Sequence, residues 1–377
     1  MHRTGESMLG LFRKKPREVA RFAVKFQPSN TVLELKQGDN LLEAALQQGV
    51  AAPYNCRVGA CKTCQIRVLE GQPKSLIERE YVFSQEEIAG GAYLACQTSV
   101  QSDMVVAWHA GAIEETATLN ARLVEVRRMT ARIHRVQLRL DAPLSWRAGQ
   151  FARLVPAGMP VDPRCYSMVA SGENEQLISF DITHYPDGAV SSWMTDTANL
   201  GRDVLVEAPF GEFGIGEASV DKPAPLLCIA GGSGLGAIGG IIAGHARSMD
   251  GGGPHGGQPA PVLLVIGARD RGEMYGLDEL RRVADSARVP LQIDVVLDRE
   301  PGDSGWQGRR GYVAEHLPQI LRQAAQGDPR FSQPDDAWRV LLCGPTPLVD
   351  TAIDALKGVG MQAGQMAFDK YEQQRAA

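Results

Sequence analysis

The chain has 377 residues, enough for two or three domains, and its 44% hydrophobic and 22% charged residues are typical of a soluble globular protein. A net charge of −5 argues against nucleic acid as the main partner, and no apolar run reaches the length that spans a membrane. The basic beginning of the chain lacks the apolar segment of a secretory signal. Seven cysteines in a chain of this size do not make a disulfide scaffold, so we expect a cytoplasmic protein.

The first elements predict a small domain built around a sheet. After a solvated tail over 1–19, two alternating apolar runs separated by Pro28-Ser29-Asn30 predict a hairpin. Asn40 is the expected N-cap of a short apolar helix that ends at Gly49. The expected strands and helix lie at 22–26, 31–35, 41–46, 65–69 and 103–108. Two strands, a helix and further strands over 20–108 are typical of a β-grasp-like domain.

Four cysteines in this domain have the spacing of a plant-type [2Fe–2S] site. Cys56, Cys61 and Cys64 follow the pattern C-x4-C-x2-C, and Cys96 comes later, where Leu94 to Gln97 predict the start of a strand. A short loop can direct three thiolates at two irons only if its backbone curls, and Gly59 permits that curl. A C-x2-C pair alone also occurs in zinc sites and dithiol redox sites. The gap of four residues and the late fourth cysteine favour the iron–sulfur interpretation.

The pattern changes after the polar segment 109–118, which we expect to be a linker. From 119 to 218, many short β-type runs predict an antiparallel barrel, with helical signal mainly at Ala189–Ala198. From 222 to 377, apolar strands alternate with helical segments, as in a parallel α/β nucleotide-binding fold, and the glycine-rich run 251–257 predicts a surface loop. The expected strands are Leu226–Ala230, Val262–Gly267, Leu291–Leu297 and Val340–Cys343. The sequence therefore predicts a multidomain chain with α+β and α/β parts.

Two segments of the predicted barrel can hold a flavin. In an R-x-Y-S pattern on one strand, Arg164 can pair with a pyrophosphate, Tyr166 can lie along the isoalloxazine ring, and Ser167 can hydrogen-bond the reactive edge of that ring. Alone, this pattern is weak evidence. The second segment is a predicted helix start, and helix N-termini bind phosphate well. Its candidate phosphate contacts are Gly188, Ser191 and Ser192.

In the last third, an apolar strand runs into a glycine-rich loop over 231–236. Such a loop between a strand and a helix lets the backbone approach a pyrophosphate, and the alternative is a tight turn that serves packing alone. A later strand ends in C-G-P at what should be the same carboxyl edge of the sheet. Its Cys343 either touches a nicotinamide or fills a buried apolar position. The candidate nucleotide contacts at this edge are Gly231, Gly232, Gly234, Gly236, Cys343, Gly344 and Pro345.

The order of the cysteine motif, R-x-Y-S, G-x-x-S, the glycine-rich loop and C-G-P resembles the ferredoxin–NAD(P)H reductase superfamily. Within it, the chain is similar to the three-domain NADH-dependent reductases of bacterial oxygenases, over about residues 20–370. The resemblance implies a [2Fe–2S] cluster on the four cysteines, FAD in the barrel and NADH over the glycine-rich loop. It also implies that the chemistry takes place beside Ser167 and Cys343.

Some positions depart from the family pattern or leave alternatives open. Thr183 and His184 stand where many relatives carry a basic residue along the flavin pyrophosphate. Near the C-terminus, either Phe368 or Tyr371 can approach the flavin. The run 269–271 follows the second strand of the last domain. In it, Asp270 suits a ribose diol and Arg269 or Arg271 a 2′-phosphate, so NADPH stays possible, and the resemblance favours NADH.

The resemblance also implies a route for the electrons. NADH gives two electrons as a hydride, an iron–sulfur cluster takes one at a time, and FAD joins the two kinds of transfer. The implied acceptor is a terminal oxygenase or an intermediate ferredoxin, with a Rieske-type aromatic-ring oxygenase first and a di-iron monooxygenase, hydroxylase or desaturase second. A redox sensor or electron-entry subunit is the alternative from another class. Four acidic residues form either part of a docking face or an ordinary solvated surface: Glu78, Glu80, Glu86 and Glu87.

Overall fold

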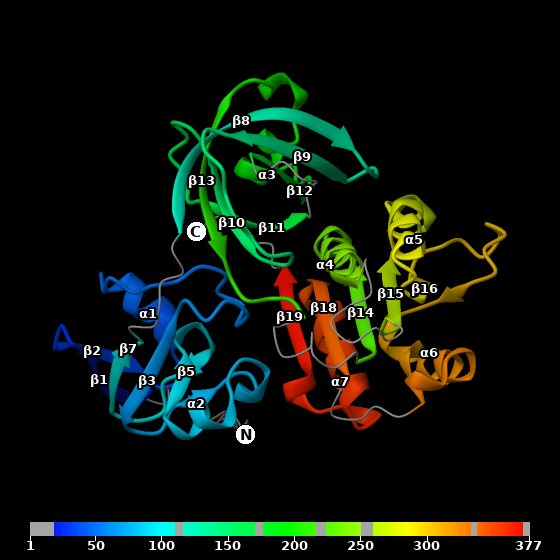
Figure 1. Ribbon diagram of the computed structural model, residues 1–377. Coiled ribbons are helices and arrows are strands. Elements are labelled where there is room, and N and C mark those ends of the chain that lie inside the picture. The colour runs from blue at the N-terminus through cyan, green and yellow to red at the C-terminus, as the bar shows by residue number, and fades with distance from the viewer. Residues whose placement is uncertain are drawn as a thin grey trace, which may run out of the picture.

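The computed structural model contains three sheet-based units that follow one another along the chain (Figure 1). The residues that it describes are 19–109, 116–169, 176–215, 224–249, 259–332 and 338–371. Most of the predicted tail, the middle of the predicted linker and the glycine-rich run 251–257 lie outside them. A five-stranded sheet, a closed antiparallel barrel and a six-stranded parallel sheet confirm the predicted α+β and α/β fold class.

The first unit is a mixed sheet with two short helices. Its elements are β1 (Arg21–Gln27), β2 (Thr31–Lys36), α1 (Leu41–Gln47), β3 (Gln65–Glu70), β4 (Lys74–Ser75), η1 (Arg79–Tyr81), α2 (Gln85–Ala89), β5 (Ala92–Leu94), η2 (Ala95–Gln97), β6 (Thr98–Ser99) and β7 (Met104–Trp108). The strand order is β2-β1-β7-β3-β5, and the predicted hairpin is confirmed by the antiparallel pairing of β1 with β2. Alternation buries Val24 and Phe26 together with the apolar face of α1. The predicted N-cap is confirmed, since Asn40 Oδ1 accepts a bond of 3.1 Å from the amide of Glu43.

The predicted strand around Cys96 is wrong. Strand β5 ends at Leu94, and the short 3-10 helix η2 turns the chain over Ala95–Gln97. Thr98 Oγ1 donates to the Leu94 carbonyl at 2.7 Å, and Asn40 Nδ2 donates to the Cys96 carbonyl at 2.8 Å. Because these side chains take carbonyls that a continued strand would offer to a neighbouring strand, the ladder stops here. The turn leaves the Cys96 side chain in the core, at 4% exposure.

The second unit is a closed barrel with the strand order β10-β11-β12-β9-β8-β13. Its elements are β8 (Ala117–Arg128), β9 (Ile133–Leu140), β10 (Phe151–Pro156), β11 (Arg164–Val169), β12 (Leu177–Thr183), α3 (Ala189–Met194), η3 (Thr197–Asn199) and β13 (Asp203–Phe210). Alternate residues of these strands fill the interior, among them the fully buried Leu123, Leu138, Leu154 and Phe180. The predicted antiparallel barrel and its one helical region are confirmed.

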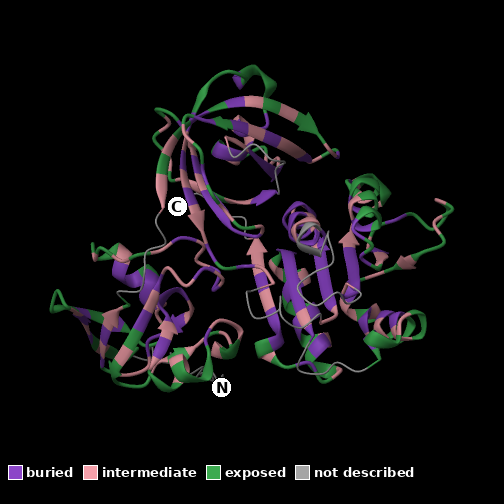
Figure 2. Cartoon of the chain, viewed as in Figure 1, coloured by how far each residue is buried: buried purple, intermediate pink, exposed green. Residues whose placement is uncertain are grey.

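The third unit is a parallel sheet in the order β17-β16-β15-β14-β18-β19, covered by helices on both faces. Its elements are β14 (Leu226–Gly231), α4 (Gly234–Met249), β15 (Val262–Ala268), η5 (Arg271–Glu273), α5 (Leu277–Ser286), β16 (Leu291–Leu297), β17 (Arg309–Arg310), α6 (Val313–Gly327), η6 (Pro329–Phe331), β18 (Arg339–Pro345), α7 (Thr346–Gly358), η7 (Ala363–Gln365) and β19 (Met366–Tyr371). Helices α4 and α5 pack on one face and α6 and α7 on the other, so the central strands are buried throughout (Figure 2). The four predicted strands are confirmed, and β19 adds an edge that was not predicted.

The barrel and the parallel sheet are joined by a buried carboxylate. Asp181 of β12 accepts two bonds from Arg135, at 2.8 and 2.9 Å, and a third from the hydroxyl of Tyr275 at 3.0 Å. A Cβ at Gly236 of α4 would lie 2.2 Å from the Asp181 Oδ2 atom, so only glycine permits this approach of helix and barrel.

Within the described residues, no helix has the length and apolarity that crossing a bilayer requires.

The first unit touches the parallel sheet through η1. The Tyr81 ring lies edge-on to Phe368 with centroids 5.7 Å apart, and Lys357 of α7 forms an ion pair with Glu78. A groove of about 740 Å³ runs along this contact. Glu87 caps α2 and lies 3.5 Å from Lys62. Two of the four acidic residues considered as a docking face are therefore engaged within the chain.

Candidate functional site

The loop between α1 and β3 curls in the way that the cysteine spacing requires. Arg57, Gly59 and Lys62 have φ angles of 59°, 86° and 53°. This left-handed conformation is unfavourable for Arg57 and Lys62, because they are not glycine. A Cβ at Gly59 would meet Gln97 Cγ at 3.0 Å. Gln97 Nε2 in turn donates to the Arg57 carbonyl at 3.3 Å, so the segment of Cys96 is tied to the loop.

The four thiols lie in two pairs. The amide of Cys56 donates to Cys61 Sγ at 3.5 Å, and the Cys64 thiol hydrogen-bonds Cys96. Hydrogen bonds with Cys61 and Cys96, together with burial, raise the pKa of Cys56 and of Cys64, whereas the hydrogen bond with Cys56 lowers the pKa of Cys61 to about 6. Across the described stretches, no three Cys, His, Asp or Glu side chains converge on a point as a single metal ion needs. Two pairs of thiols fit two irons better than one tetrahedral zinc ion.

The predicted Ser167 and Cys343 are brought together by the last strand of the parallel sheet. Ser167 Oγ of β11 donates to Asp369 Oδ2 at 2.6 Å, and the Tyr371 hydroxyl lies 3.3 Å from the same Ser167 Oγ. Cys343 Sγ of β18 lies 3.0 Å from that tyrosine hydroxyl. Strand β19 pairs with β18 in parallel, which places Asp369 beside Cys343. One polar chain therefore links the barrel to the carboxyl edge of the sheet.

Burial controls the protonation of this polar chain. It raises the pKa of Asp369 to about 6, and the bond from Ser167 acts in the opposite direction. It also raises the pKa of Cys343 and of Tyr371 well above their usual values. Cys343 and Tyr371 therefore keep their protons at neutral pH, whereas Asp369 can gain or lose one there.

The other predicted flavin residues surround this polar chain. The Arg164 guanidinium donates to the Asp162 carbonyl at 3.0 Å, and Tyr166 packs against the barrel core, where burial raises its pKa above the usual value. At α3, the hydroxyls of the predicted serines turn back to the chain. Ser191 Oγ donates to the Gly188 carbonyl at 3.2 Å, and Ser192 Oγ donates to the Tyr185 carbonyl at 2.7 Å. Backbone amides and Arg164 thus stay available for phosphate.

The glycine-rich loop combines packing with an open cradle. A Cβ at Gly231 would lie 2.3 Å from Leu348 Cδ2, and one at Gly234 would lie 2.3 Å from the Cys343 carbonyl oxygen. A Cβ at Gly344 would lie 2.9 Å from the Gly231 carbonyl oxygen. Only Gly232, at φ 56°, has no atom within 4 Å of where a Cβ would stand. This glycine leaves room for a phosphate beside the start of α4, where the helix dipole favours an anion.

Comparison with known proteins agrees with this geometry. The family model for a 2Fe-2S iron-sulfur cluster binding domain matches residues 24–101, and that for an oxidoreductase NAD-binding domain matches residues 228–354. The xylene/toluene monooxygenase electron transfer component of Pseudomonas putida is 27% identical, over 90% of this chain and 90% of its own length. The naphthalene 1,2-dioxygenase system reductase component of the same species is 26% identical, over 92% of this chain and 97% of its own.

A crystal structure of an Amycolatopsis cytochrome P450 reductase has a TM-score of 0.61 to this chain at 28% identity, covering 93% of this chain and 98% of that one. The chain therefore joins a [2Fe–2S] cluster domain to an oxidoreductase NAD-binding domain, and it is similar over nearly its whole length to reductase components of oxygenase systems. Its cofactors are a [2Fe–2S] cluster, FAD and NAD(P)H. The reductase is an NAD(P)H oxidoreductase of the kind that serves as the electron-transfer component of oxygenase systems.

One residue of the reductase's polar chain, Asp369, was not predicted. It stands between the two aromatic residues of the run Phe368-Asp369-Lys370-Tyr371, which lacks the strict alternation that signals a strand. The structure also decides between the two aromatics. Phe368 is 5% exposed in the core against Tyr81, and Tyr371 is the one beside Ser167.

Thr183, which we expected along the flavin pyrophosphate, lies next to the glycine-rich loop. Its hydroxyl lies 3.2 Å from the Ser233 hydroxyl of the glycine-rich loop, and His184 Nδ1 lies 2.8 Å from Thr195 Oγ1. The Thr183 side chain thus joins the reductase's barrel to its nucleotide loop. Arg269, a predicted nucleotide contact, lies at the end of β15, where burial and the guanidinium groups of Arg132 and Arg299 lower its pKa.

Proposed function

We propose that the reductase takes a hydride from NADH onto FAD held beside Ser167 and delivers single electrons through a [2Fe–2S] cluster on Cys56, Cys61, Cys64 and Cys96. The observation that carries this proposal is the bond of 2.6 Å from Ser167 to Asp369, because it unites the barrel strand with the nucleotide edge at one point. FAD, when bound, supplies the conversion between hydride transfer and one-electron transfer. The chain's own residues position the nicotinamide and the flavin and hold a proton.

The residue roles follow from the polar chain. Ser167 fixes the reactive edge of the flavin with its hydroxyl, and Asp369 orients that hydroxyl by accepting its proton. With its pKa raised to about 6 by burial, Asp369 takes up a proton as the pH falls through that value, and the protonated carboxyl can donate a hydrogen bond to Ser167 Oγ. Cys343 and Tyr371 stay protonated, so they shape the nicotinamide position without acting as bases.

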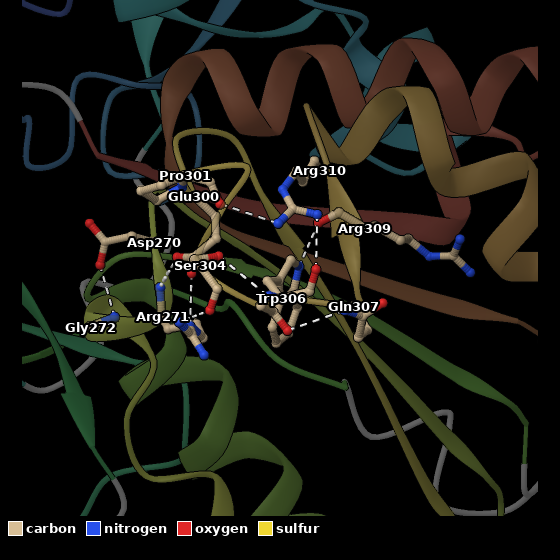
Figure 3. Close-up of polar contacts among 11 residues, drawn as sticks. Asp270, Arg271, Gly272, Glu300, Pro301, Ser304, Trp306, Gln307, Arg309 and Arg310 are labelled. Carbon is tan, nitrogen blue, oxygen red and sulfur yellow. Dashed lines mark hydrogen bonds and ion pairs between the residues drawn. The ribbon is translucent and has the colours of Figure 1, made fainter.

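We further propose NADH as the preferred donor, because carboxylates inside the chain already neutralise the arginines that would bind a 2′-phosphate. Arg271 Nε lies 2.8 Å from Glu300 Oε1, and the Arg271 Nη2 atom donates to the Ser304 carbonyl at 2.7 Å (Figure 3). Arg269 Nε likewise donates to Glu273 at 2.7 Å. Asp270 caps η5 and keeps a carboxylate at the loop, which suits a ribose diol.

The electron acceptor that we propose is a Rieske-type oxygenase that acts on an aromatic ring. Relatives named for naphthalene dioxygenase, xylene/toluene monooxygenase and phenol monooxygenase systems support an aromatic compound as the final substrate. Because those names include monooxygenases, a di-iron monooxygenase is the second candidate. We place the reductase in the cytoplasm, where a reducing environment keeps its seven free thiols available. We also propose that the chain divides into three domains, at residues 20–108, 119–218 and 222–377.

The test is reconstitution with purified candidate oxygenases, with product formation as the readout. We expect NADH-dependent turnover with a Rieske oxygenase and a higher kcat/KM for NADH than for NADPH. An E273Q/E300Q double variant should gain activity with NADPH, since it frees both arginines. Turnover with a di-iron partner alone would replace the first candidate by the second. A purified protein that reduces no one-electron acceptor would contradict the proposal.

A further inference from the structure

A row of three side chains crosses the face of the barrel that meets the cluster loop. In the antiparallel registers of β13, β10 and β11, Glu207 lies opposite Arg153, and Arg153 lies opposite Cys165. Register partners share one face of a sheet, so the three side chains stand next to one another. Ser167 lies on the same face, two residues further along β11. The row therefore starts beside the residue that faces the flavin.

The cluster loop is attached to this row through Asn55. Arg153 Nη1 donates to Asn55 Oδ1 at 3.4 Å, and Asn55 Nδ2 donates to Thr63 Oγ1 at 2.9 Å. Asn55 precedes the first cysteine and Thr63 precedes the third in the loop, so this one amide holds both ends of the loop. Asn55 is 7% exposed, and Glu207 balances the charge of Arg153 at 3.1 Å.

A second contact holds the other side of the loop. Lys62 lies 3.6 Å from Glu212, which follows β13 at the rim of the barrel. Cys165 of β11 is the register partner of Arg153, and Arg153 in turn reaches Asn55, which precedes Cys56 in the loop. The cluster loop and the flavin-facing strand β11 thus lie on the two sides of Arg153.

We propose that Arg153 is a positioning residue for electron transfer from FAD to the cluster: it fixes the cluster loop against β11 through Asn55. This inference rests on the proposed function, because it places FAD at Ser167 and the cluster on the loop. Two transfers, each of one electron from reduced FAD to a ferric ion of the cluster, would reoxidise the flavin, and the single proton that accompanied the two electrons would be released to solvent. No bond to Arg153 forms or breaks. Arg153 affects the transfer rate only through the distance between FAD and the cluster, because the rate of electron tunnelling falls steeply as that distance grows.

The test compares Arg153→Met with Arg122→Met. Arg122 is a matched control, because it also pairs with a carboxylate of a register partner in this barrel, Asp203 at 3.4 Å, but on a solvent-exposed face. Iron and flavin contents are measured first. In anaerobic stopped flow with NADH, bleaching of the flavin should keep its wild-type rate in both variants. Reduction of the cluster should slow severalfold in Arg153→Met only, because a loop no longer held against β11 widens the gap that the electron crosses.

A second readout does not depend on turnover. Hydrogen exchange of the amides at 54–64 in the oxidised holoprotein should accelerate in Arg153→Met and stay unchanged in Arg122→Met. Arg153→Lys, which keeps the charge beside Glu207, should restore part of the cluster reduction rate. Unchanged cluster reduction in flavin- and iron-replete Arg153→Met would overturn the inference, and so would equal slowing in Arg122→Met. Wild-type protein that binds no flavin or iron would instead overturn the proposed function.

Discussion

The cluster loop and the carboxyl edge of the parallel sheet both hold cofactors, but their sequences specify them in different ways. In the loop, the position of each cysteine is dictated by the iron atoms that it must reach, so the spacing itself reveals the ligand. At the sheet edge, Gly231, Gly234 and Gly236 serve close packing, and Gly232 alone has open space beside it. A metal site leaves a readable pattern, whereas a nucleotide site shares its pattern with the packing of the fold.

The largest expected effect is a complete loss of function at the cluster loop with function at the sheet edge retained. Cys96→Ser removes one of the four thiolates, so we expect loss of the cluster and of transfer to one-electron acceptors. Reduction of FAD by NADH should stay close to the wild-type rate, because the polar chain at Ser167 does not involve Cys96. Iron content, EPR of the reduced protein and stopped-flow flavin bleaching check this. Loss of both steps together would mean that the sheet edge depends on the loop.

The next effect tests the packing glycines. Gly234→Ala would put a Cβ 2.3 Å from the Cys343 carbonyl oxygen, and overpacking of this kind costs about 1–3 kcal/mol in free energy of unfolding. Gly239→Ala in the same helix is the control, since no atom lies within 4 Å of its Cβ position and alanine is the better helix former. Calorimetry should show a lower melting temperature for Gly234→Ala alone. Equal melting temperatures would contradict the packing role.

The third effect concerns pH. The folded pKa of Asp369, about 6, exceeds its unfolded value of 3.8, so its contribution to stability is fully present below 3.8 and is lost as pH rises through 6. Linkage gives a loss of about 1.4 kcal/mol between pH 5 and pH 8. Asp369→Asn lacks this dependence. Calorimetry of both proteins should therefore find the variant gaining relative stability as the pH rises, and a constant difference would contradict the pKa.

The smallest effect tests the open cradle. In Gly232→Ala the new methyl group contacts no neighbouring atom. The expected loss in free energy of unfolding comes from placing alanine at a left-handed φ of 56°, and it is about 1 kcal/mol. We expect little change in melting temperature, and weaker binding of NADH because the methyl group occupies space for phosphate. Titration of NAD+ followed by flavin absorbance checks this. A variant that binds like the wild type would remove Gly232 from the nucleotide site.

Local patterns revealed most elements but few of the contacts between them. The four main strands of the parallel sheet and the cap at Asn40 depend on nearby residues, and they were predicted. The partner of Ser167 lies 202 residues away in the chain, and no local signal connects them. Asp181 was visible as an acidic residue inside an apolar strand, but its partners Arg135 and Tyr275 were not.

One mistaken element has the same physical origin. The apolar residues around Cys96 have β propensity, and the turn η2 is imposed by side chains from elsewhere in the unit. Asn40 takes the Cys96 carbonyl at 2.8 Å, which propensity cannot anticipate. The prediction failed where the cluster site overrides the local preference of the chain, and the cysteine spacing was a better guide there than the apolar pattern.

Strand β19 has a consequence for how the protein is made. A ribosome releases the barrel long before it adds Asp369 and Tyr371, so a growing polypeptide carries Ser167 without its partners. The pocket for the hydride donor is therefore closed last during synthesis.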